Sequence, residues 1–316
     1  MSFALPVSVA PLTLLHAGAQ LTLTRFTVHP STVIGIIALG ALYWWRAREG
    51  GRDSRSMVGR TRASVFAAGL LTMFFALNGW IHDLSDSFLF SAHMVQHLLL
   101  ALVVAPLLIM GTPGWMLRPA LRSPLVRGVA GAVTNPLRTF AFFNLVVAAW
   151  HLPPLYNVAM AHHPVHILQH LTFLVAAVLM WWPILSPLPE LPRLAYPMQM
   201  LYLFLMSIPM SIVSVYIAYA DGVLYPAYAS APRIWGLSPM EDQLVGALIM
   251  WIPGGLFFFA IISVIFFRWQ QHDGDETMAG AQVREDGALS AGRGVWEGER
   301  EAVPAHPSAD HLPATR

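Results

Sequence analysis

A series of apolar runs, each close to the length that crosses a bilayer as a helix, constrains this chain more than any other feature. A hydrocarbon core of about 30 Å is spanned by about 20 mostly apolar residues in helical form. Seven runs approach or reach that length: 31–46, 63–80, 88–110, 137–151, 165–185, 196–219 and 243–269. Backbone groups in lipid must pair within their own segment, so each run is predicted to be an α-helix. We therefore expect an all-α integral membrane protein, with a bundle of seven transmembrane helices in a membrane domain at 28–269.

The composition supports this fold class and excludes several functions. Hydrophobic residues make up 56% of the chain and charged residues 11%, whereas a soluble domain carries about 25% charged residues. There is no cysteine, which excludes disulfides, thiolate metal sites and iron–sulfur clusters. All 18 basic residues are arginine, so Schiff-base chemistry on lysine is excluded as well. No basic patch is interleaved with exposed aromatic residues, so nothing indicates nucleic-acid binding.

Arginine counts in the short loops predict the orientation of the bundle. The loops after the first and third runs hold Arg46, Arg48, Arg52, Arg55, Arg60, Arg62, Arg118, Arg122 and Arg127. The loops after the second and fourth runs hold no arginine. Arginine-rich loops stay in the cytoplasm, which places the N-terminus outside and the C-terminus in the cytoplasm.

The two ends of the chain are predicted to lie outside the membrane domain. Residues 1–27 are moderately apolar but lack the charged start of a signal peptide, and we interpret them as an extracytoplasmic lead-in. Residues 270–316 hold nine acidic residues and four arginines, with almost no large apolar side chains. Such a composition is typical of disorder, so we expect a disordered, acidic cytoplasmic tail.

Polar side chains are concentrated at the predicted external ends of the helices. Eight of the 13 histidines lie there: His82, His93, His97, His151, His162, His163, His166 and His170. Acidic and amide side chains join them at this level: Asp83, Asp86, Asp221, Glu241, Asp242 and Gln243. Ionisable groups in a membrane are costly and usually functional. A single histidine at a helix end is equally well explained by a bond to interfacial water or a lipid headgroup, and that alternative stays open for His82, His151, His162 and His163.

Two histidine pairs make the metal-site interpretation specific. Residues 93–97 read His-Met-Val-Gln-His and residues 166–170 read His-Ile-Leu-Gln-His, and a spacing of four places two imidazoles on one helix face. Both helices are predicted to run inward from outside, so the pairs lie at matched depth. Neutral imidazole is a common ligand of Zn, Cu and Fe. The predicted metal ligands are therefore His93, His97, His166 and His170. Gln96 and Gln169 are expected to orient the rings.

Two neighbouring residues have competing interpretations. Met94 lies beside His93 and offers a thioether that suits Cu(I), although packing explains most of the 15 methionines. Asp242 begins the last predicted helix, where an acidic residue favourably meets the positive end of the helix dipole. Capping is therefore a full alternative to a role of Asp242 at the metal site.

Four segments carry a resemblance to a known family. Residues 91–97 read Ser-Ala-His-Met-Val-Gln-His, with Ala-Pro-Leu-Leu-Ile-Met-Gly-Thr-Pro at 105–113, and residues 150–157 read Trp-His-Leu-Pro-Pro-Leu-Tyr-Asn. The pair at 166–170 is followed by Trp-Trp-Pro at 181–183, and residues 242–254 read Asp-Gln-Leu-Val-Gly-Ala-Leu-Ile-Met-Trp-Ile-Pro-Gly. In this order, over residues 30–268, they resemble the multi-spanning CtaG family of cytochrome c oxidase assembly factors.

The resemblance implies a metallochaperone of the bacterial cell (inner) membrane, not an enzyme. It would deliver a copper ion to cytochrome c oxidase during assembly, towards subunit I. The expected partners are that oxidase subunit, the lipid bilayer and an extracytoplasmic copper donor. The implied copper ligands are the two histidine pairs. Accessory candidates, by resemblance or by their level in the bundle, are His151, Asp242, His82, His163 and Met94.

Two other functions remain open from the sequence. A membrane di-iron oxygenase of the desaturase or hydroxylase type collects histidines from short-spaced clusters, such as 162–166, but its chemistry is expected on the cytoplasmic face. A haem-b electron carrier would hold each iron by one histidine from each of two facing helices, and pairs on parallel helices do not obviously provide such sites.

Overall fold

The computed structural model of the chain describes residues 26–49 and 51–301, and the side chains of 26–49 and 59–273. The described part of the chain is helical, with no strand, as the sequence predicts. The long helices are α1 (Pro30–Glu49), α2 (Gly51–Leu77), α8 (Pro136–His151), α10 (His163–Leu185), α11 (Tyr196–Ala218) and α13 (Pro239–Glu301). The central helix consists of α4 (Phe90–Leu98), the π-helical turn η1 (Leu99–Val104) and α5 (Ala105–Gly111).

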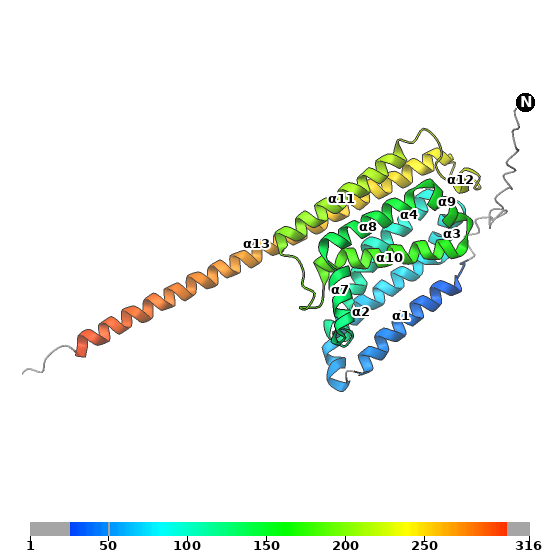
Figure 1. Cartoon of the computed structure of the whole chain (residues 1–316). Helices are drawn as coiled ribbons and strands as arrows, with labels where there is room; N and C mark the ends of the chain where they lie inside the picture. The colour runs from blue at the N-terminus through cyan, green and yellow to red at the C-terminus, as the bar shows by residue number, and fades with distance from the viewer. Residues whose placement is uncertain (1–25, 50, 302–316) are drawn as a thin grey trace, which may run out of the picture. The chain divides into compact units, whose positions relative to one another are not determined.

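Short helices close the two ends of the bundle. At one end lie α3 (Gly79–Ser87), α9 (Pro153–Ala161) and α12 (Pro226–Ala229), and α7 (Pro124–Val133) lies at the other (Figure 1). The remaining turns are α6 (Gly114–Leu117) and η2 (Ala120–Arg122). The end that carries α3, α9 and α12 is the one that the arginine counts place outside the cell.

The chain divides into two compact units, 1–263 and 264–316. In the second unit α13 continues as a helix through Glu301, where the sequence predicted a disordered tail from residue 270. Extending an existing helix costs less free energy than nucleating a new one. Residues 302–316 of that tail, and residues 1–25 of the expected lead-in, lie outside the described residues, so those predictions stay untested.

Five helices are long and apolar enough to cross a membrane: Gly59–Ser87, Phe90–Gly111, His163–Leu185, Tyr196–Ala218 and Pro239–Asp273. They correspond to five of the seven predicted runs. The other two form α1 and α8. α8 has only 16 residues before it ends at His151, which is about 24 Å of helix at 1.5 Å per residue. α1 carries Arg46, Arg48 and Glu49 in its last turn. Seven spans and the orientation of the termini therefore remain predictions.

A break between α2 and α3 directs the polar end of the second span into the bundle. Gly79 has a φ of 65°, a left-handed conformation that favours glycine, and Asn78 before it is extended. The Asn78 side chain accepts a hydrogen bond from the backbone N–H of His29 at 2.7 Å. A Cβ on Gly79 would lie 2.2 Å from the ring of Phe26. With this turn, α3 places His82 in the interior.

The π-helical turn η1 joins the central helix to α10. The Ala105 N–H bonds the carbonyl of Leu100, five residues earlier. The same spacing would pair the Ala101 carbonyl with Pro106, which has no N–H. The indole N–H of Trp181 on α10 donates to the Ala101 carbonyl instead, at 2.8 Å. The wide turn thus frees a carbonyl that anchors the neighbouring helix.

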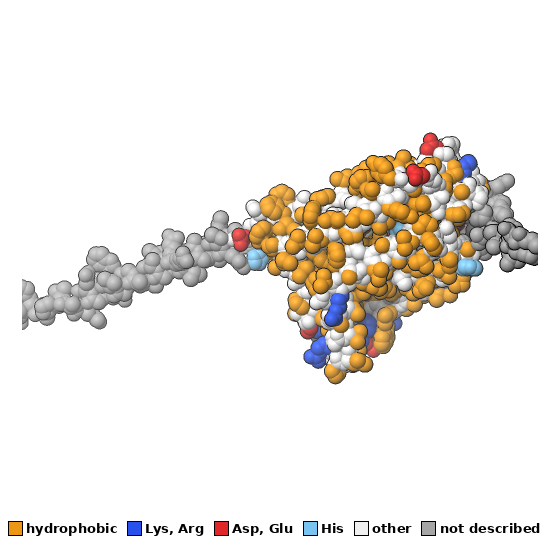
Figure 2. Space-filling view, turned by 45° about the horizontal axis from the view of Figure 1, so that its top comes forward, with side chains coloured by type: hydrophobic (Ala, Val, Ile, Leu, Met, Phe, Trp, Pro, Cys, Tyr) orange, Lys and Arg blue, Asp and Glu red, His pale blue; other side chains and the backbone are white. Residues whose placement is uncertain are grey.

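Large hydrophobic side chains are exposed along the helices. Figure 2 shows hydrophobic side chains over most of the visible face, with most of the arginines gathered near one end. Leu145, Ile212 and Leu256 are each more than 60% exposed. An apolar surface of this extent marks an interaction with a membrane or a protein. Together with the five long apolar helices, it identifies a membrane protein.

Candidate metal centre

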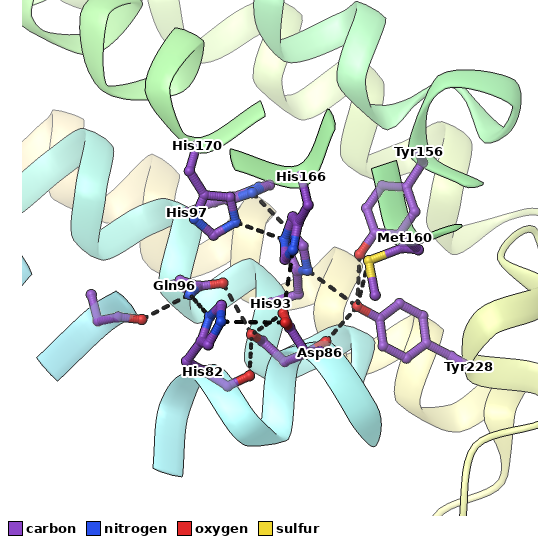
Figure 3. Close-up of polar contacts among 12 residues, drawn as sticks. His82, Asp86, His93, Gln96, His97, Tyr156, Met160, His166, His170 and Tyr228 are labelled. Atoms are coloured by element: carbon purple, nitrogen blue, oxygen red, sulfur yellow. Dashed lines mark hydrogen bonds and ion pairs between the residues drawn. The ribbon is translucent and has the colours of Figure 1, made fainter. Parts of the chain in front are cut away.

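The two predicted histidine pairs face one another across α4 and α10 (Figure 3). Within each helix the two Nε2 atoms are 2.9 Å apart, between His93 and His97 and between His166 and His170. Across the helices, the ring centroid of His93 lies 5.4 Å from that of His166, and the centroids of His97 and His170 are 5.6 Å apart. All four side chains are buried. We call these residues the histidine quartet.

Three members of the quartet already have the spacing of a metal site. One nitrogen each from His93, His97 and His170 lies within 4.8 Å of the others. Nitrogens bound at about 2.0 Å to one tetrahedral ion would be about 3.3 Å apart, so small rotations of the rings suffice. His166 contacts His170 and is the natural fourth ligand. The quartet contains no carboxylate or thiolate, and its chemistry is that of a neutral imidazole site.

A tyrosine from a distant loop fixes the protonation of His93. The Tyr228 hydroxyl, on α12, donates to the Ser85 carbonyl at 2.7 Å. Its single proton is thereby used, so its oxygen accepts from Tyr156 at 2.9 Å and from Nδ1 of His93 at 3.1 Å. Burial raises the pKa of both tyrosines well above the ordinary value, so both hydroxyls stay protonated. The proton of His93 is on Nδ1, and its Nε2 presents a lone pair to the quartet.

Asp86 and Gln96 form a second polar layer beside the quartet. The Gln96 amide donates to Nδ1 of His82 at 3.0 Å, which leaves the proton of His82 on Nε2, 3.3 Å from Asp86. The other carboxylate oxygen of Asp86 is 3.7 Å from Nδ1 of His166. A carboxylate beside a ligating histidine orients the ring and raises its basicity. Asp86 thus lies against one quartet ring, whereas Gln96 contacts His82 and no quartet ring by these bonds.

Gln169, which was expected to orient the histidine rings, makes no such contact. Gln169 is fully buried on α10, but neither its side-chain oxygen nor its nitrogen has a hydrogen-bond partner among the described residues. The predicted orienting role has no contact to support it. Buried amides are usually satisfied, so Gln169 is the least satisfied polar side chain near the site.

The accessory candidates separate into two groups. His82 is close to the quartet, with its ring centroid 6.0 Å from that of His166. The ring centroids of His151 and His97 are 5.9 Å apart. Met94, His97 and His151 line the same small cavity. His163 is exposed in the first turn of α10. Its ring is 6.4 Å from that of His29.

The carboxylate of Asp242 is hydrogen-bonded to the start of α4. Its carboxylate accepts from the backbone N–H of Phe90 at 2.7 Å and from that of Ser91 at 3.1 Å, and the Ser91 hydroxyl donates to it at 2.5 Å. The expected capping role is therefore present, but on a helix 150 residues earlier rather than on its own. This fully buried carboxylate positions the start of α4, and a role of Asp242 at the metal site stays a prediction.

The sequence alone does not indicate Tyr156, Tyr228 or Ser85 as site residues. Tyr156 lies inside one of the four family-like segments, which was a usable signal. Tyr228 lies on the short helix α12 in a stretch with no recognisable pattern, and its bond to His93 spans 135 positions. Only the tertiary structure brings it to the site.

The comparisons with known proteins agree with the resemblance seen in the sequence. The family model described as "Cytochrome c oxidase caa3 assembly factor" matches residues 38–272, which include the whole quartet. Two uncharacterized proteins, Mb0105 of Mycobacterium bovis and MT0111 of Mycobacterium tuberculosis, are each 25% identical over 203 residues, 59% of this chain and 31% of theirs. The uncharacterized protein ML1998 of Mycobacterium leprae is 22% identical over 228 residues, 67% of this chain and 34% of its own. The chain thus spans about a third of the length of these curated relatives. No solved structure matches.

Proposed function

The chain belongs to the family of cytochrome c oxidase caa3 assembly factors, and we propose that it acts by holding a copper ion in the histidine quartet and passing it to an oxidase subunit. The observation that carries the proposal is the meeting of four buried imidazoles from two helices, three of them with nitrogens within 4.8 Å. The ion is cargo, and no bond is made or broken except those to the metal.

The donor set favours copper among the common metals. Carboxylate-rich sites suit Mg, Ca and Mn, and thiolates suit iron–sulfur clusters, whereas imidazole nitrogens suit Cu and Zn. For a given nitrogen site, Cu(II) binds more tightly than the other divalent first-row ions. The membership in an oxidase assembly family agrees with copper as cargo, since the resemblance implies copper delivery.

A cavity gives the ion a route to the quartet. It has a volume of about 500 Å³ and is lined by His29 and His163 as well as by His166 and His170. His163 is exposed, and the quartet members are buried. In the proposed orientation this end faces outward, so a copper donor outside the cytoplasm would load the site through these histidines. Release follows by exchange of imidazoles for ligands on the docked subunit, for which subunit I is the proposed acceptor.

The competing functions find less support in the geometry. Of the eight histidines between 82 and 170, His162 and His163 are exposed, so the set that a di-iron oxygenase would need is not assembled. A haem-b carrier needs space for a porphyrin between two histidines. The rings of the quartet are in contact with one another, with centroids 4.3 Å apart for His93 and His97.

Metal content of the detergent-purified chain tests the proposal. The wild type, a variant with His93, His97, His166 and His170 all changed to Ala, and a control with His162→Ala are loaded with copper and desalted. We expect the wild type and the control to retain copper and a folded quartet variant to lose most of it. In cells the quartet variant is expected to lower oxidase activity. Equal copper in all three proteins, or iron in place of copper in the protein as purified, would overturn the proposal.

A further inference from the structure

The larger cavity extends from the histidine end along the length of α10. Its volume is about 500 Å³, and its lining on α10 runs from His163 to Leu179. At 1.5 Å per residue this stretch of helix is about 24 Å long. The rest of the lining comes from α1 and the residue before it, from α2 and α3, and from the central helix. We call this space the lateral cavity.

The polarity of the lateral cavity changes along its length. On α10 the polar lining residues, His163, His166 and His170, all lie in the first eight residues of the helix. Every lining residue that follows them on α10, from Leu171 to Leu179, is apolar. The lining of α1 changes in the same way, from Ser31 and Thr32 in its first turn to Ile36 and Leu39. The polar end thus suits an ion or a head group, whereas the longer apolar part suits a hydrocarbon.

The dimensions of the lateral cavity select a single chain as its occupant. A volume of about 500 Å³ over about 24 Å of length corresponds to a mean width of about 5 Å. An α-helix with its side chains is about 10–12 Å across, so a transmembrane helix of another protein does not fit inside. One leaflet of a bilayer, including its head groups, is about 20–22 Å deep. An extended acyl chain of one lipid therefore matches both the width and the depth.

The lateral cavity is accessible from the surface of the bundle that faces lipid. Three of its lining residues on α10, Ile167, Leu171 and Val175, are between 41% and 56% exposed. On α1, Gly35 is exposed, and a Cβ built on it meets nothing within 4 Å. The walls are apolar at these positions, so a hydrocarbon chain can enter from the bilayer without crossing a polar layer.

We propose that the lateral cavity binds one phospholipid, with an acyl chain along the apolar wall of α10 and the phosphate at the histidine end. Phosphodiester oxygens only accept hydrogen bonds, and this end offers the hydroxyl of Ser31 and the ring N–H of His163, both exposed. The inference goes beyond copper delivery and does not depend on it.

The bound lipid would also act on the proposed metal site. Because His166 and His170 line the lateral cavity, an acyl chain within it occupies the space beside the quartet and keeps other hydrocarbon away. The polar end stays open to an ion. A phosphate beside His163 places a negative charge there, which raises the local concentration of a cation at the entrance.

Lipid retention by the full-length protein tests the proposal. Protein purified from membranes is exchanged into fresh detergent, and the phospholipid bound per chain is measured by native mass spectrometry. We expect the wild type to retain one phospholipid. Gly35→Phe places a ring where an added Cβ has open space, and displacing two buried methylene groups weakens binding by about tenfold. The matched control is Gly255→Phe on α13, since a Cβ on Gly255 also meets nothing within 4 Å; it should retain the lipid.

A second pair of variants keeps the test decisive if Gly35→Phe does not fold. Val175→Phe narrows the lateral cavity from α10 and should lower the retained phospholipid as well, whereas Val245→Phe, at a similarly exposed position of α13, should not. Equal phospholipid in the wild type and in both folded cavity variants would overturn the proposal. A wild type that retains no lipid, or that holds a different amphiphile such as a quinone, would overturn it too.

The lipid and the copper are measured separately, so the two proposals can fail separately. The variant with all four quartet histidines changed to Ala is expected to retain its phospholipid, because the apolar wall is unchanged. A wild type that retains phospholipid but binds no copper would overturn the proposed function and leave the lipid site standing. Copper bound by a wild type that retains no phospholipid would do the reverse.

Discussion

Helices α4 and α10 carry the same pattern of histidine, two apolar residues, glutamine and histidine, but their surroundings differ. On α4, Gln96 donates to the Ala76 carbonyl at 2.8 Å and to His82 at 3.0 Å, and its oxygen accepts from the Ser85 hydroxyl at 3.0 Å. On α10, Gln169 is equally buried without any such bond in the described residues. The same sequence pattern thus has a bonded glutamine on α4 and an unbonded glutamine on α10.

The two helices also differ in how their starts are anchored and in which histidines a cavity reaches. The start of α4 is held by the buried carboxylate of Asp242, while α10 begins at His163 without a side-chain cap. The larger cavity is lined by His166 and His170 but not by the α4 pair. We infer that α4 holds the fixed half of the quartet and that an ion enters and leaves at α10. The following substitutions test this difference, from the largest expected effect to the smallest.

Asp242→Ala should have the largest effect. It removes a charged acceptor and leaves two buried N–H groups of α4 unsatisfied, which we expect to lower the free energy of unfolding by about 3 kcal/mol. Asp242→Asn, which keeps one acceptor oxygen, should lose less. Thermal unfolding in detergent measures both, with the exposed Asp221→Ala as control. Equal stability of the Asp242→Ala and Asp221→Ala proteins would contradict an anchoring role.

The two glutamines provide a matched pair. Gln96→Leu removes the donor to the Ala76 carbonyl and to Nδ1 of His82, whereas the Ser85 hydroxyl keeps its bond to the His82 carbonyl. We expect it to destabilise the protein by about 2 kcal/mol. Gln169→Leu removes polar atoms that have no partner, so its effect should be neutral or slightly stabilising. Denaturation of the two variants in the same detergent gives the comparison directly. A larger loss for Gln169→Leu would show that α10 is the bonded half after all.

Tyr228→Phe should act on the metal more than on the fold. The substitution frees Nδ1 of His93 from its acceptor, so the ring no longer presents Nε2 to the quartet in a fixed protonation state. Outer partners of metal ligands contribute about tenfold or more to affinity, and we expect a tenfold weaker retention of copper. Chelator competition measures it, with Tyr219→Phe, an exposed residue, as control. An unchanged copper affinity would mean that Tyr228 does not act on the quartet.

His162→Ala should have the smallest effect. The residue occupies the N-cap position of α10, but its exposed side chain makes no capping bond. Exposed substitutions of this kind change stability by less than about 0.5 kcal/mol. A loss comparable to that of Asp242→Ala, seen in the same thermal unfolding assay, would mean that both helix starts are fixed and that the difference between α4 and α10 is small.

The sequence was most informative where the relevant interactions are local. The spacing of His93 with His97 and of His166 with His170 predicted which rings share a helix face, and the structure brings both pairs together. The partners that set their protonation were not predictable, because Tyr228 and Asp242 lie more than 130 positions from α4 residues that they bond. The predicted run 137–151 also matches α8, which ends at His151 before Pro153 starts a new helix; its crossing of the membrane stays a prediction.

The π-helical turn in the central helix has a consequence for the angular phase of its two halves. Each residue in a helix advances the direction of the side chains by about 100°, and a π turn accommodates one extra residue without changing the direction of the axis. The phase of the histidine pair on α4 is therefore independent of the phase that α5 needs for its own packing. Deleting one residue from Leu99–Val104 would restore a regular helix and turn His93 and His97 by about 100° relative to α5. In evolutionary terms, a single inserted codon would be enough to turn an ordinary packing helix into one that presents both rings to α10.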